Sequence, residues 1–314
     1  MDTIWIVLIS IFGFAFLFVL FYFFVNFLFY KMSLSRRNLT KLIVNSAVRR
    51  RKEEMMIDFD WFDDKKVEIL EMKSKDKLLL KANFYEQDKS EYLAVICHGY
   101  GADFREMSSY AKYFYDRGFS LLLPEARGHG LSQGKIIGMG WPERKDIKKW
   151  IDLMVKKNPN YKIVLFGLSM GSSTVCMTVG ENLASNVKCA ISDCGYANAY
   201  EQFKYVSSLF KVFHPNLVMK MYNGFLREVF RINLHDFDAA KQLKKTNIPM
   251  LFIHGEKDEF VPYKNLDILY NACASNCKEK YSVAGAKHAM SYATNVEEYI
   301  NRLNKFLDKY FYKI

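Results

Sequence analysis

One pentapeptide and its flanks constrain the fold more than any other feature of this chain: Gly167-Leu-Ser169-Met-Gly171. Before it stands Tyr161-Lys-Ile-Val-Leu-Phe166, a short apolar run with β-branched residues that predicts a buried strand. After it stands Ser172-Ser-Thr-Val-Cys-Met-Thr-Val179, whose small residues favour a helix packed closely against a sheet. Gly-x-Ser-x-Gly between a strand and a helix predicts a nucleophile elbow, a strained turn that exposes the hydroxyl of Ser169. The pentapeptide alone is a common pattern, so its flanks carry this prediction.

Short apolar runs alternate with helical patterns along the rest of the chain. Strands are expected at Val67–Met72, Leu78–Tyr85, Tyr92–Cys97, Phe119–Leu123, Lys162–Phe166, Val187–Ser192, Met250–Ile253 and Glu279–Val283. Helices are expected between them, for example over 106–117, 143–157 and 295–310. The first two strands, separated by a polar turn, are typical of an antiparallel hairpin. Strand and helix in alternation predict an α/β fold whose mostly parallel sheet is covered by helices on both faces.

One insertion, at about residues 196–234, interrupts this alternation. It lies between the strand ending at Ser192 and the strand starting at Met250, and it is rich in large apolar residues. Their spacing is helical in places. Two interpretations stay open: a helical cap over the site, or an additional packing layer.

The N-terminus predicts a transmembrane helix over residues 1–30. From Ile4 to Tyr30 the only ionisable side chains are tyrosines, Tyr22 and Tyr30. Such a run is long enough to cross a hydrocarbon core of about 30 Å. A cleaved signal peptide is disfavoured, because the start is acidic (Asp2), the apolar run is too long and no small-x-small cleavage site follows. Residues 31–54 are then a basic connector, and residues 55–314 one α/β domain.

The charge distribution indicates the orientation of this helix. The chain has a formal charge of +11, and no Lys or Arg precedes the span. The basic residues that follow it closely are Lys31, Arg36, Arg37, Lys41, Arg49, Arg50, Arg51 and Lys52. Basic flanks tend to stay in the cytoplasm, which predicts the N-terminus outside and the domain in the cytoplasm. The same stretch could hold anionic lipid headgroups, although a topology signal explains it equally well. No nucleic-acid-binding motif accompanies the charge, so nucleic acid is not an expected partner.

The cysteines give no sign of a metal site. The six cysteines are Cys97, Cys176, Cys189, Cys194, Cys273 and Cys277. They form no paired Cys-x-x-Cys framework, so structural zinc is not expected. Several lie in apolar runs, where a free cysteine behaves as a small hydrophobic residue. No metal or organic cofactor is indicated.

A serine nucleophile needs a base, and the base needs an acid that orients it. After an elbow, the acid is expected behind a later strand and the histidine later still. The run Met250-Leu-Phe-Ile-His-Gly-Glu-Lys-Asp258 is a strand that enters a turn ending in an aspartate. The run Ala284-Gly-Ala-Lys-His288 is a loop after the last strand. The order Ser169, Asp258, His288 therefore predicts a nucleophile, an acid and a base.

Other acidic residues and histidines are alternative candidates for the same roles. Glu259 is an adjacent alternative acid, and Asp193, after an earlier strand, is a weaker one. His254 is interpreted as structural, and His129 stands upstream of the serine, in the wrong order. The remaining histidines are His98, at a strand end, and His214 and His235, in the insertion.

Acyl transfer also needs two backbone N–H groups directed at the developing oxyanion. Met170 supplies one, because it directly follows Ser169 at the expected start of a helix. The other is expected from the loop His98-Gly-Tyr-Gly101, where Tyr100 is the best-placed donor.

Several motifs carry a resemblance to a known group of proteins. They are His98-Gly-Tyr-Gly-Ala102, Pro124-Glu-Ala-Arg-Gly-His-Gly-Leu-Ser132, Gly167-Leu-Ser-Met-Gly171, His254-Gly-Glu-Lys-Asp258 and Lys287-His288. In this order they resemble the α/β-hydrolase superfamily, and most closely its serine aminopeptidase and monoacylglycerol-lipase-like branch. The segment from Gly138 to Trp150 is also similar to membrane-anchored bacterial members.

The resemblance covers about residues 67–310. It implies Ser169 as the nucleophile, Asp258 and His288 as its partners, and Tyr100 and Met170 as oxyanion donors. One departure is Glu125, where many relatives have aspartate before the Arg-Gly-His-Gly element; this position is interpreted as structural.

These patterns predict a membrane-anchored serine hydrolase that cleaves carboxylic esters through an acyl-serine intermediate. The apolar insertion and the membrane helix favour a small-molecule or lipid-like acyl substrate. A serine aminopeptidase or thioesterase would use the same residues, although the insertion offers no compelling acidic group to hold a substrate ammonium. A non-catalytic binding protein on the same fold is the remaining alternative, since fold alone does not imply activity.

Overall fold

The computed structural model describes residues 3–37, 53–209 and 214–312. The strands are β1 (Glu68–Lys73), β2 (Leu79–Tyr85), β3 (Tyr92–Cys97), β4 (Ser120–Pro124), β5 (Lys162–Leu168), β6 (Val187–Asp193), β7 (Met250–Gly255) and β8 (Lys278–Val283). They form one sheet in the order β1-β2-β4-β3-β5-β6-β7-β8. β2 pairs antiparallel with β1 and with β4, whereas the other pairs are parallel. The predicted α/β fold with a mostly parallel sheet is confirmed, including the N-terminal hairpin.

The helices lie close to their predicted positions. The α-helices are α1 (Thr3–Ser33), α3 (Ser108–Tyr115), α4 (Glu143–Lys157), α5 (Met170–Thr178), α6 (Ala199–Leu209), α7 (Pro215–Phe230), α8 (Ala239–Leu243), α9 (Asn265–Ala272), α10 (Ser291–Thr294) and α11 (Val296–Tyr310). The 3-10 helices are η1 (Phe59–Phe62), η2 (Phe104–Met107) and η3 (Leu234–Asp236). The helix predicted over 106–117 is divided between η2 and α3, because the Asp103 side chain accepts the Arg105 N–H and starts a 3-10 turn first.

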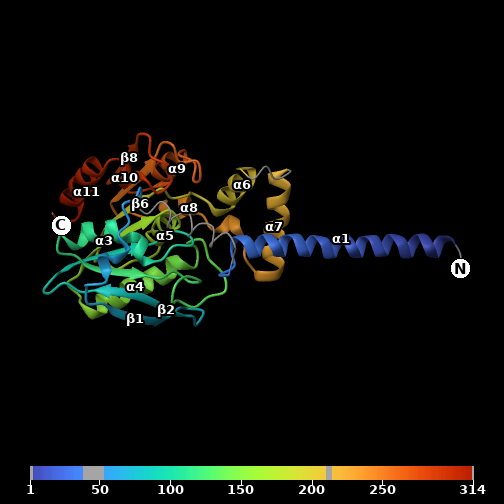
Figure 1. Ribbon diagram of the computed structural model, residues 1–314, viewed down its shortest axis with the longest axis horizontal. Helices are drawn as coiled ribbons and strands as arrows, with labels where there is room; N and C mark the ends of the chain where they lie inside the picture. Colours follow the sequence, from blue (N-terminus) through green and yellow to red (C-terminus); the bar gives the residue numbers. More distant parts are fainter. Residues whose placement is uncertain (1–2, 38–52, 210–213, 313–314) are drawn as a thin grey trace.

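The sheet separates two apolar cores. Successive side chains of a strand point to opposite faces. On β5, Ile163 and Leu165 pack on one face, the side of α4, α5, α8 and α9. Val164 and Phe166 pack on the other, the side of α3 and α11. Figure 1 shows these helices on both sides of the sheet.

The insertion forms the helix pair α6 and α7, which stands out from the sheet beside α1 (Figure 1). Pro215 occupies the first turn of α7, where its missing N–H costs nothing. Met219, Tyr222 and Phe225 of α7 are buried and belong to the same apolar core as the sheet. Phe210 and Phe213, which contributed to the predicted pattern, lie outside the described residues.

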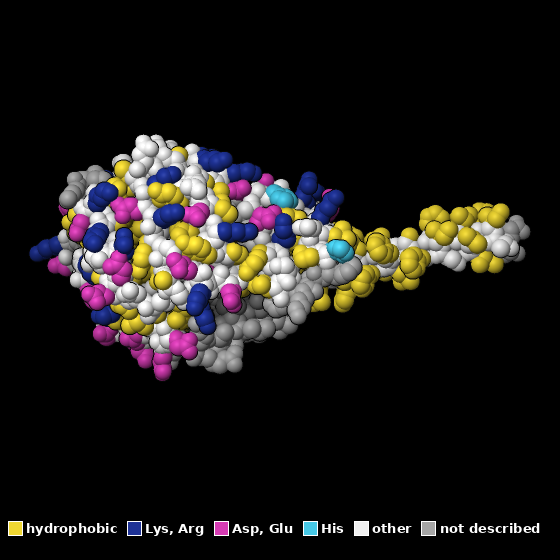
Figure 2. Space-filling view, turned by 90° about the horizontal axis from the view of Figure 1, so that it is seen from above, with side chains coloured by type: hydrophobic (Ala, Val, Ile, Leu, Met, Phe, Trp, Pro, Cys, Tyr) yellow, Lys and Arg dark blue, Asp and Glu magenta, His cyan; other side chains and the backbone are white. Residues whose placement is uncertain are grey.

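Among the described residues, α1 is the one helix long and apolar enough to cross a membrane. It projects from the body as a single rod (Figure 1), and its surface is covered by apolar side chains (Figure 2). Its last turns are different, because they pack against α7. The Tyr22 hydroxyl donates to the carbonyl of Met221 (3.0 Å), and the hydroxyls of Ser33 and Tyr222 lie 2.6 Å apart.

The chain leaving α1 is joined to the α/β body. The Ile137 N–H donates to the Leu34 carbonyl (2.7 Å), and the Arg36 N–H donates to the Lys135 carbonyl (2.9 Å). Leu34 is fully buried. The expected connector therefore begins as part of the body. Its remaining basic residues, Lys41, Arg49, Arg50, Arg51 and Lys52, lie outside the described part of the chain.

Candidate active site

The turn between β5 and α5 has the strained geometry that its glycines predict. Ser169 has φ 55° and ψ −115°, a left-handed φ that costs of the order of 1–3 kcal/mol in a non-glycine residue. A Cβ on Gly167 would lie 2.2 Å from the Gly171 carbonyl oxygen, and one on Gly171 would lie 2.0 Å from that of Cys97. Glycine is therefore required at both positions for the strand, the turn and the helix to approach so closely.

The structure brings Ser169, His288 and Asp258 together at the carboxyl edge of the sheet. Ser169 follows β5, Asp258 follows β7 and His288 follows β8. The Ser169 Oγ lies 2.9 Å from His288 Nε2, and His288 Nδ1 lies 2.7 Å from Asp258 Oδ2. Ser169 and His288 are partly exposed, whereas Asp258 is buried. The hydroxyl is thus within reach of a base that an acid orients.

The two alternative acids are not part of this chain of hydrogen bonds. Glu259 is exposed, and its backbone carbonyl accepts the Tyr205 hydroxyl. Asp193 is fully buried, and its side chain accepts hydrogen bonds from Ser291 (3.0 Å) and Tyr299 (2.9 Å). Burial raises the pKa of Asp193 to about 6, although these two hydrogen bonds oppose the rise.

Asp258 is held by four contacts. Its Oδ1 accepts the N–H groups of Phe260 (3.0 Å) and Val261 (2.8 Å). Its Oδ2 accepts from His288 and also lies 3.2 Å from Nε2 of His254. Burial alone would raise the pKa of Asp258, but the hydrogen bonds from His254 and His288 hold it well below its usual range. The carboxylate is therefore kept ionised beside His288.

His254 has a closer relation to the site than its sequence position indicated. It is buried at 1 % exposure, and its Nε2 also lies 2.9 Å from the Val261 carbonyl. The Nε2–H group of His254 is thus shared between the Val261 carbonyl and the carboxylate of Asp258. The signal in the sequence was its place four residues before Asp258, at the end of the same strand.

The two expected oxyanion donors flank Ser169. Met170 opens α5, where N–H groups of the first turn have no partner within the helix. A Cβ on Gly99 would lie 3.7 Å from the Cβ of Ser169, so the loop that carries Tyr100 is next to the serine. The Tyr100 side chain points away, and its hydroxyl donates to the carbonyl of Ser33 (2.5 Å). Tyr100 can therefore act on the site only through its backbone.

Two buried histidines brace this loop. His129 Nε2 accepts the Gly101 N–H (3.0 Å), and His98 Nε2 accepts the Ala126 N–H (3.0 Å). Each ring therefore carries its proton on Nδ1, which faces a backbone carbonyl. Both histidines thus hold the backbone around the candidate oxyanion donors, and neither belongs to the hydrogen-bonded series of Ser169.

The Arg-Gly-His-Gly turn is shaped by Glu125 and Arg127. The Glu125 carboxylate accepts the Leu131 N–H, which agrees with a structural interpretation of this position. The buried Arg127 guanidinium donates to Asp146 (2.9 and 2.8 Å) and to Asp76 (2.8 and 3.2 Å).

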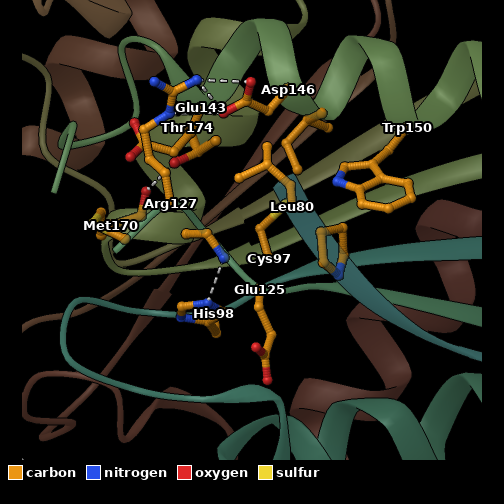
Figure 3. A pocket seen from close by; sticks show the side chains of 13 residues that line it. Leu80, Cys97, His98, Glu125, Arg127, Glu143, Asp146, Trp150, Met170 and Thr174 are labelled. Carbon is orange, nitrogen blue, oxygen red and sulfur yellow. Dashed lines mark hydrogen bonds and ion pairs between the residues drawn. The ribbon is translucent and has the colours of Figure 1, made fainter. Parts of the chain in front are cut away.

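A small cavity of about 20 Å³ lies behind the elbow, between Met170, His98 and the Arg127 cluster (Figure 3). A cavity of this size has room for one water molecule. Glu143 also lines it; its Oε1 accepts the Gly138 N–H (2.8 Å), and its Oε2 is buried without a partner. Burial raises the pKa of Glu143 to about 7, although the charge of Arg127 opposes the rise.

The described residues contain one group of side chains close enough to ligate a metal, namely Cys194, Asp258 and His288. Asp258 and His288 are already bonded to each other. Cys194 is fully buried, and burial raises the pKa of its thiol well above the usual value. The thiolate that a metal needs is therefore disfavoured, and this group fits hydrogen bonding better than metal ligation.

The sheet order and the elbow define a class of folds, and this chain has the α/β-hydrolase fold. Over residues 88–226 the chain is similar to the family described as serine aminopeptidase, S33. A curated relative is an uncharacterized protein, YqkD of Bacillus subtilis (strain 168), 27% identical over 215 residues that cover 68% of this chain and 70% of YqkD.

Solved structures share the fold at low identity. The esterase Pf2001 of Pyrococcus furiosus has a TM-score of 0.64 and 18% identity, covering 82% of this chain and 94% of its own. The acylaminoacyl peptidase of Pyrococcus horikoshii has a TM-score of 0.57 and 17% identity, covering 79% of this chain and 42% of its own. One fold thus carries both an esterase and a peptidase among these neighbours.

Proposed function

We propose that this protein is a membrane-anchored serine hydrolase that cleaves carboxylic esters. The observation that carries the proposal is the hydrogen-bonded series Ser169 Oγ, His288 and Asp258, with separations of 2.9 and 2.7 Å. Ser169 is the nucleophile, His288 the general base and Asp258 the acid that orients it.

The reaction follows from this geometry. Ser169 Oγ attacks the ester carbonyl while His288 Nε2 takes its proton. The backbone N–H groups of Met170 and Tyr100 stabilise the oxyanion, each worth about 3 kcal/mol in comparable sites. His288 then gives the proton to the departing alcohol, which leaves an acyl group on Ser169. Water, deprotonated by His288, attacks the acyl group, and the released serine recovers its proton.

The surroundings of the base favour an acyl or lipid-like substrate. The ring of Phe260, 45 % exposed, lies 5.1 Å from the imidazole of His288 between ring centroids. The cap helices α6 and α7 carry further exposed apolar side chains, Leu209, Leu217 and Val229. Apolar surface of this kind binds hydrocarbon better than a charged group.

A peptidase is the second candidate, because the matching family is described as serine aminopeptidase and one structural neighbour is an acylaminoacyl peptidase. The full chain in detergent is assayed with short and long p-nitrophenyl esters and with aminoacyl p-nitroanilides. Esters are expected to be preferred in kcat/KM, and the Ser169→Ala variant should lose this activity. Faster cleavage of the amides would overturn the ester assignment.

A non-catalytic protein on this fold is tested separately with a fluorophosphonate probe. The wild type should be labelled under native conditions and Ser169→Ala should not. An unlabelled, folded wild type would favour a binding or scaffold role.

Membrane anchoring by α1 is part of the proposal, with the N-terminus outside and the hydrolase domain in the cytoplasm. It is supported by the length and apolar surface of α1 and by the basic residues that follow. In intact cells, the domain should resist an added protease. Digestion from outside would refute this orientation.

A further inference from the structure

An open groove of about 1200 Å³ lies where α1 meets the α/β body. Its apolar wall includes Tyr30, Trp141 and Phe237, and the rings of Trp141 and Phe237 are stacked with centroids 6.0 Å apart. We call it the juxtamembrane groove.

Basic side chains dominate its polar lining. Lys31, Arg36, Arg37, Lys135 and Arg231 all line the groove. Among the described residues, Lys31, Arg37, Lys135 and Arg231 are exposed and make no ion pair with a carboxylate. Arg36 is held in place, because its guanidinium donates to two backbone carbonyls (2.8 Å each).

The acidic lining does not balance these charges. Asp76 is paired with Arg127, which also lines the groove. Asp236 is then the other carboxylate among the described lining residues, and it accepts a hydrogen bond from the Asn233 side chain. The lining of the groove therefore combines an excess of positive charge with apolar side chains.

A topology signal does not explain this arrangement. Such a signal concerns basic residues close in sequence to a membrane span. Lys135 belongs to the loop before α4, and Arg231 is the left-handed residue that ends α7. Both are far from α1 in sequence, yet they line the same groove as Lys31 and Arg37.

The length of α1 places this groove at the depth of lipid headgroups. From Trp5 to Lys31 the helix is about 39 Å long at 1.5 Å per residue. A bilayer with its headgroup layers is about 40–45 Å thick. Trp and Lys are typical of the two interfaces. With Trp5 in one headgroup layer, Lys31 lies in the other, and exposed apolar residues such as Phe24 and Phe27 adjoin it on α1.

We infer that the juxtamembrane groove binds the phosphodiester headgroup of an anionic phospholipid, whose acyl chains lie along α1. The inference rests on the proposed membrane anchoring. Each basic residue near a membrane surface contributes about 1 kcal/mol to attraction of anionic lipid. The apolar wall suits the glycerol and upper acyl region, which a free phosphate lacks.

The test uses the full chain in mild detergent with mixed micelles of phosphatidylglycerol and phosphatidylcholine, and the retained lipid is quantified by mass spectrometry. The wild type should retain phosphatidylglycerol selectively. The double variant Lys135→Glu/Arg231→Glu should lower the apparent affinity by about 30-fold. The matched control Lys66→Glu/Lys305→Glu changes charge equally at exposed sites outside the groove and should retain the lipid.

Two results would overturn the inference. An equal loss in the control variant would mean that net charge alone attracts the lipid. Displacement of phosphatidylglycerol by inorganic phosphate at constant ionic strength would mean that the groove takes a free anion. Flotation with vesicles reports anchoring separately: a wild type that fails to float refutes the anchor, whereas a floating double variant without retained lipid confirms the groove.

Discussion

Two buried carboxyl groups near the elbow, those of Asp258 and Glu143, have pKa values shifted in opposite directions. Asp258 is 5 % exposed and Glu143 is 2 % exposed, so burial is nearly the same. Asp258 has donors on both oxygens, whereas Glu143 has one on Oε1 and none on Oε2. The pKa of Asp258 is lowered, and that of Glu143 is raised by burial to about 7. Partners, more than depth, decide which carboxylate stays charged.

The pKa of Asp193 lies between those of Asp258 and Glu143. It has two hydroxyl donors, yet burial still raises its pKa to about 6. Asp258 has two imidazoles within hydrogen-bonding distance, those of His254 and His288, whereas Asp193 has none among the described residues. The comparison therefore predicts a ranking of substitutions at these positions.

The largest effect is expected for Asp258→Asn. An amide preserves the shape of the side chain but removes the charge that orients His288 and stabilises its protonated form. We expect kcat/KM for a p-nitrophenyl ester to fall about 10⁴-fold, as at comparable sites. An effect below tenfold, with the fold intact by circular dichroism, would contradict the role of this acid.

His254 comes next, as a positioning residue. His254→Leu removes the N–H that faces Asp258 and Val261, and we expect a loss of about 10- to 100-fold in kcat/KM. The pKa of Asp258 itself should also rise, because this donor is one of the two that hold it low, and an NMR titration of the carboxyl group reports that rise directly. His254→Gln keeps an N–H donor and should recover part of both effects. Equal losses in the two variants, with the pKa of Asp258 unchanged, would indicate packing alone.

Asp193→Asn should have a much smaller effect on catalysis. The side chain of Asp193 contacts Ser291 and Tyr299, whereas the N–H of Ser169 binds its backbone carbonyl, which the substitution keeps. We expect kcat/KM to stay within about threefold of the wild type. If this variant lost as much activity as Asp258→Asn, the assignment of the acid would have to be reversed.

Glu143→Gln should leave activity unchanged and alter stability instead. A pKa raised from 4.5 to about 7 means that Glu143 supports the fold fully below pH 4.5 and progressively less as the pH rises through 7. This loss is at most about 3 kcal/mol. The free energy of unfolding is measured with denaturant in detergent. Between pH 5 and pH 8 that of Glu143→Gln should rise relative to that of the wild type.

The exposed Glu297→Gln serves as the control for that experiment. It should show no such gain. The same pH dependence in Glu143→Gln and the wild type would show that the buried oxygen has a partner after all.

The positions of the strands along the chain, the elbow and the candidate residues Ser169, Asp258 and His288 were accessible from the sequence, whereas the order of the strands in the sheet was not. Each has a local signature: glycines where the backbone is crowded, an apolar strand before the acid, a glycine loop before the histidine. Such signatures give chain order, and the topology of a parallel sheet then brings the strand ends to one edge.

The supporting contacts were not accessible in this way. The local sequence favours a structural role for His254, because nothing in it indicates that the ring faces Asp258. Glu143 opens the polar run Glu-Arg-Lys-Asp, which is typical of an exposed helix start, yet it is buried against the elbow. The last turns of α1 read as lipid-facing, because apolar composition cannot distinguish a lipid neighbour from α7.

The most direct test of the central claim is to map the covalent adduct of a fluorophosphonate probe by peptide mass spectrometry, with wild type and Asp258→Asn labelled in parallel. We expect one adduct, on the Ser169 hydroxyl, which forms quickly in the wild type and far more slowly in the variant. An adduct on another residue, or equal labelling rates in the two proteins, would contradict it.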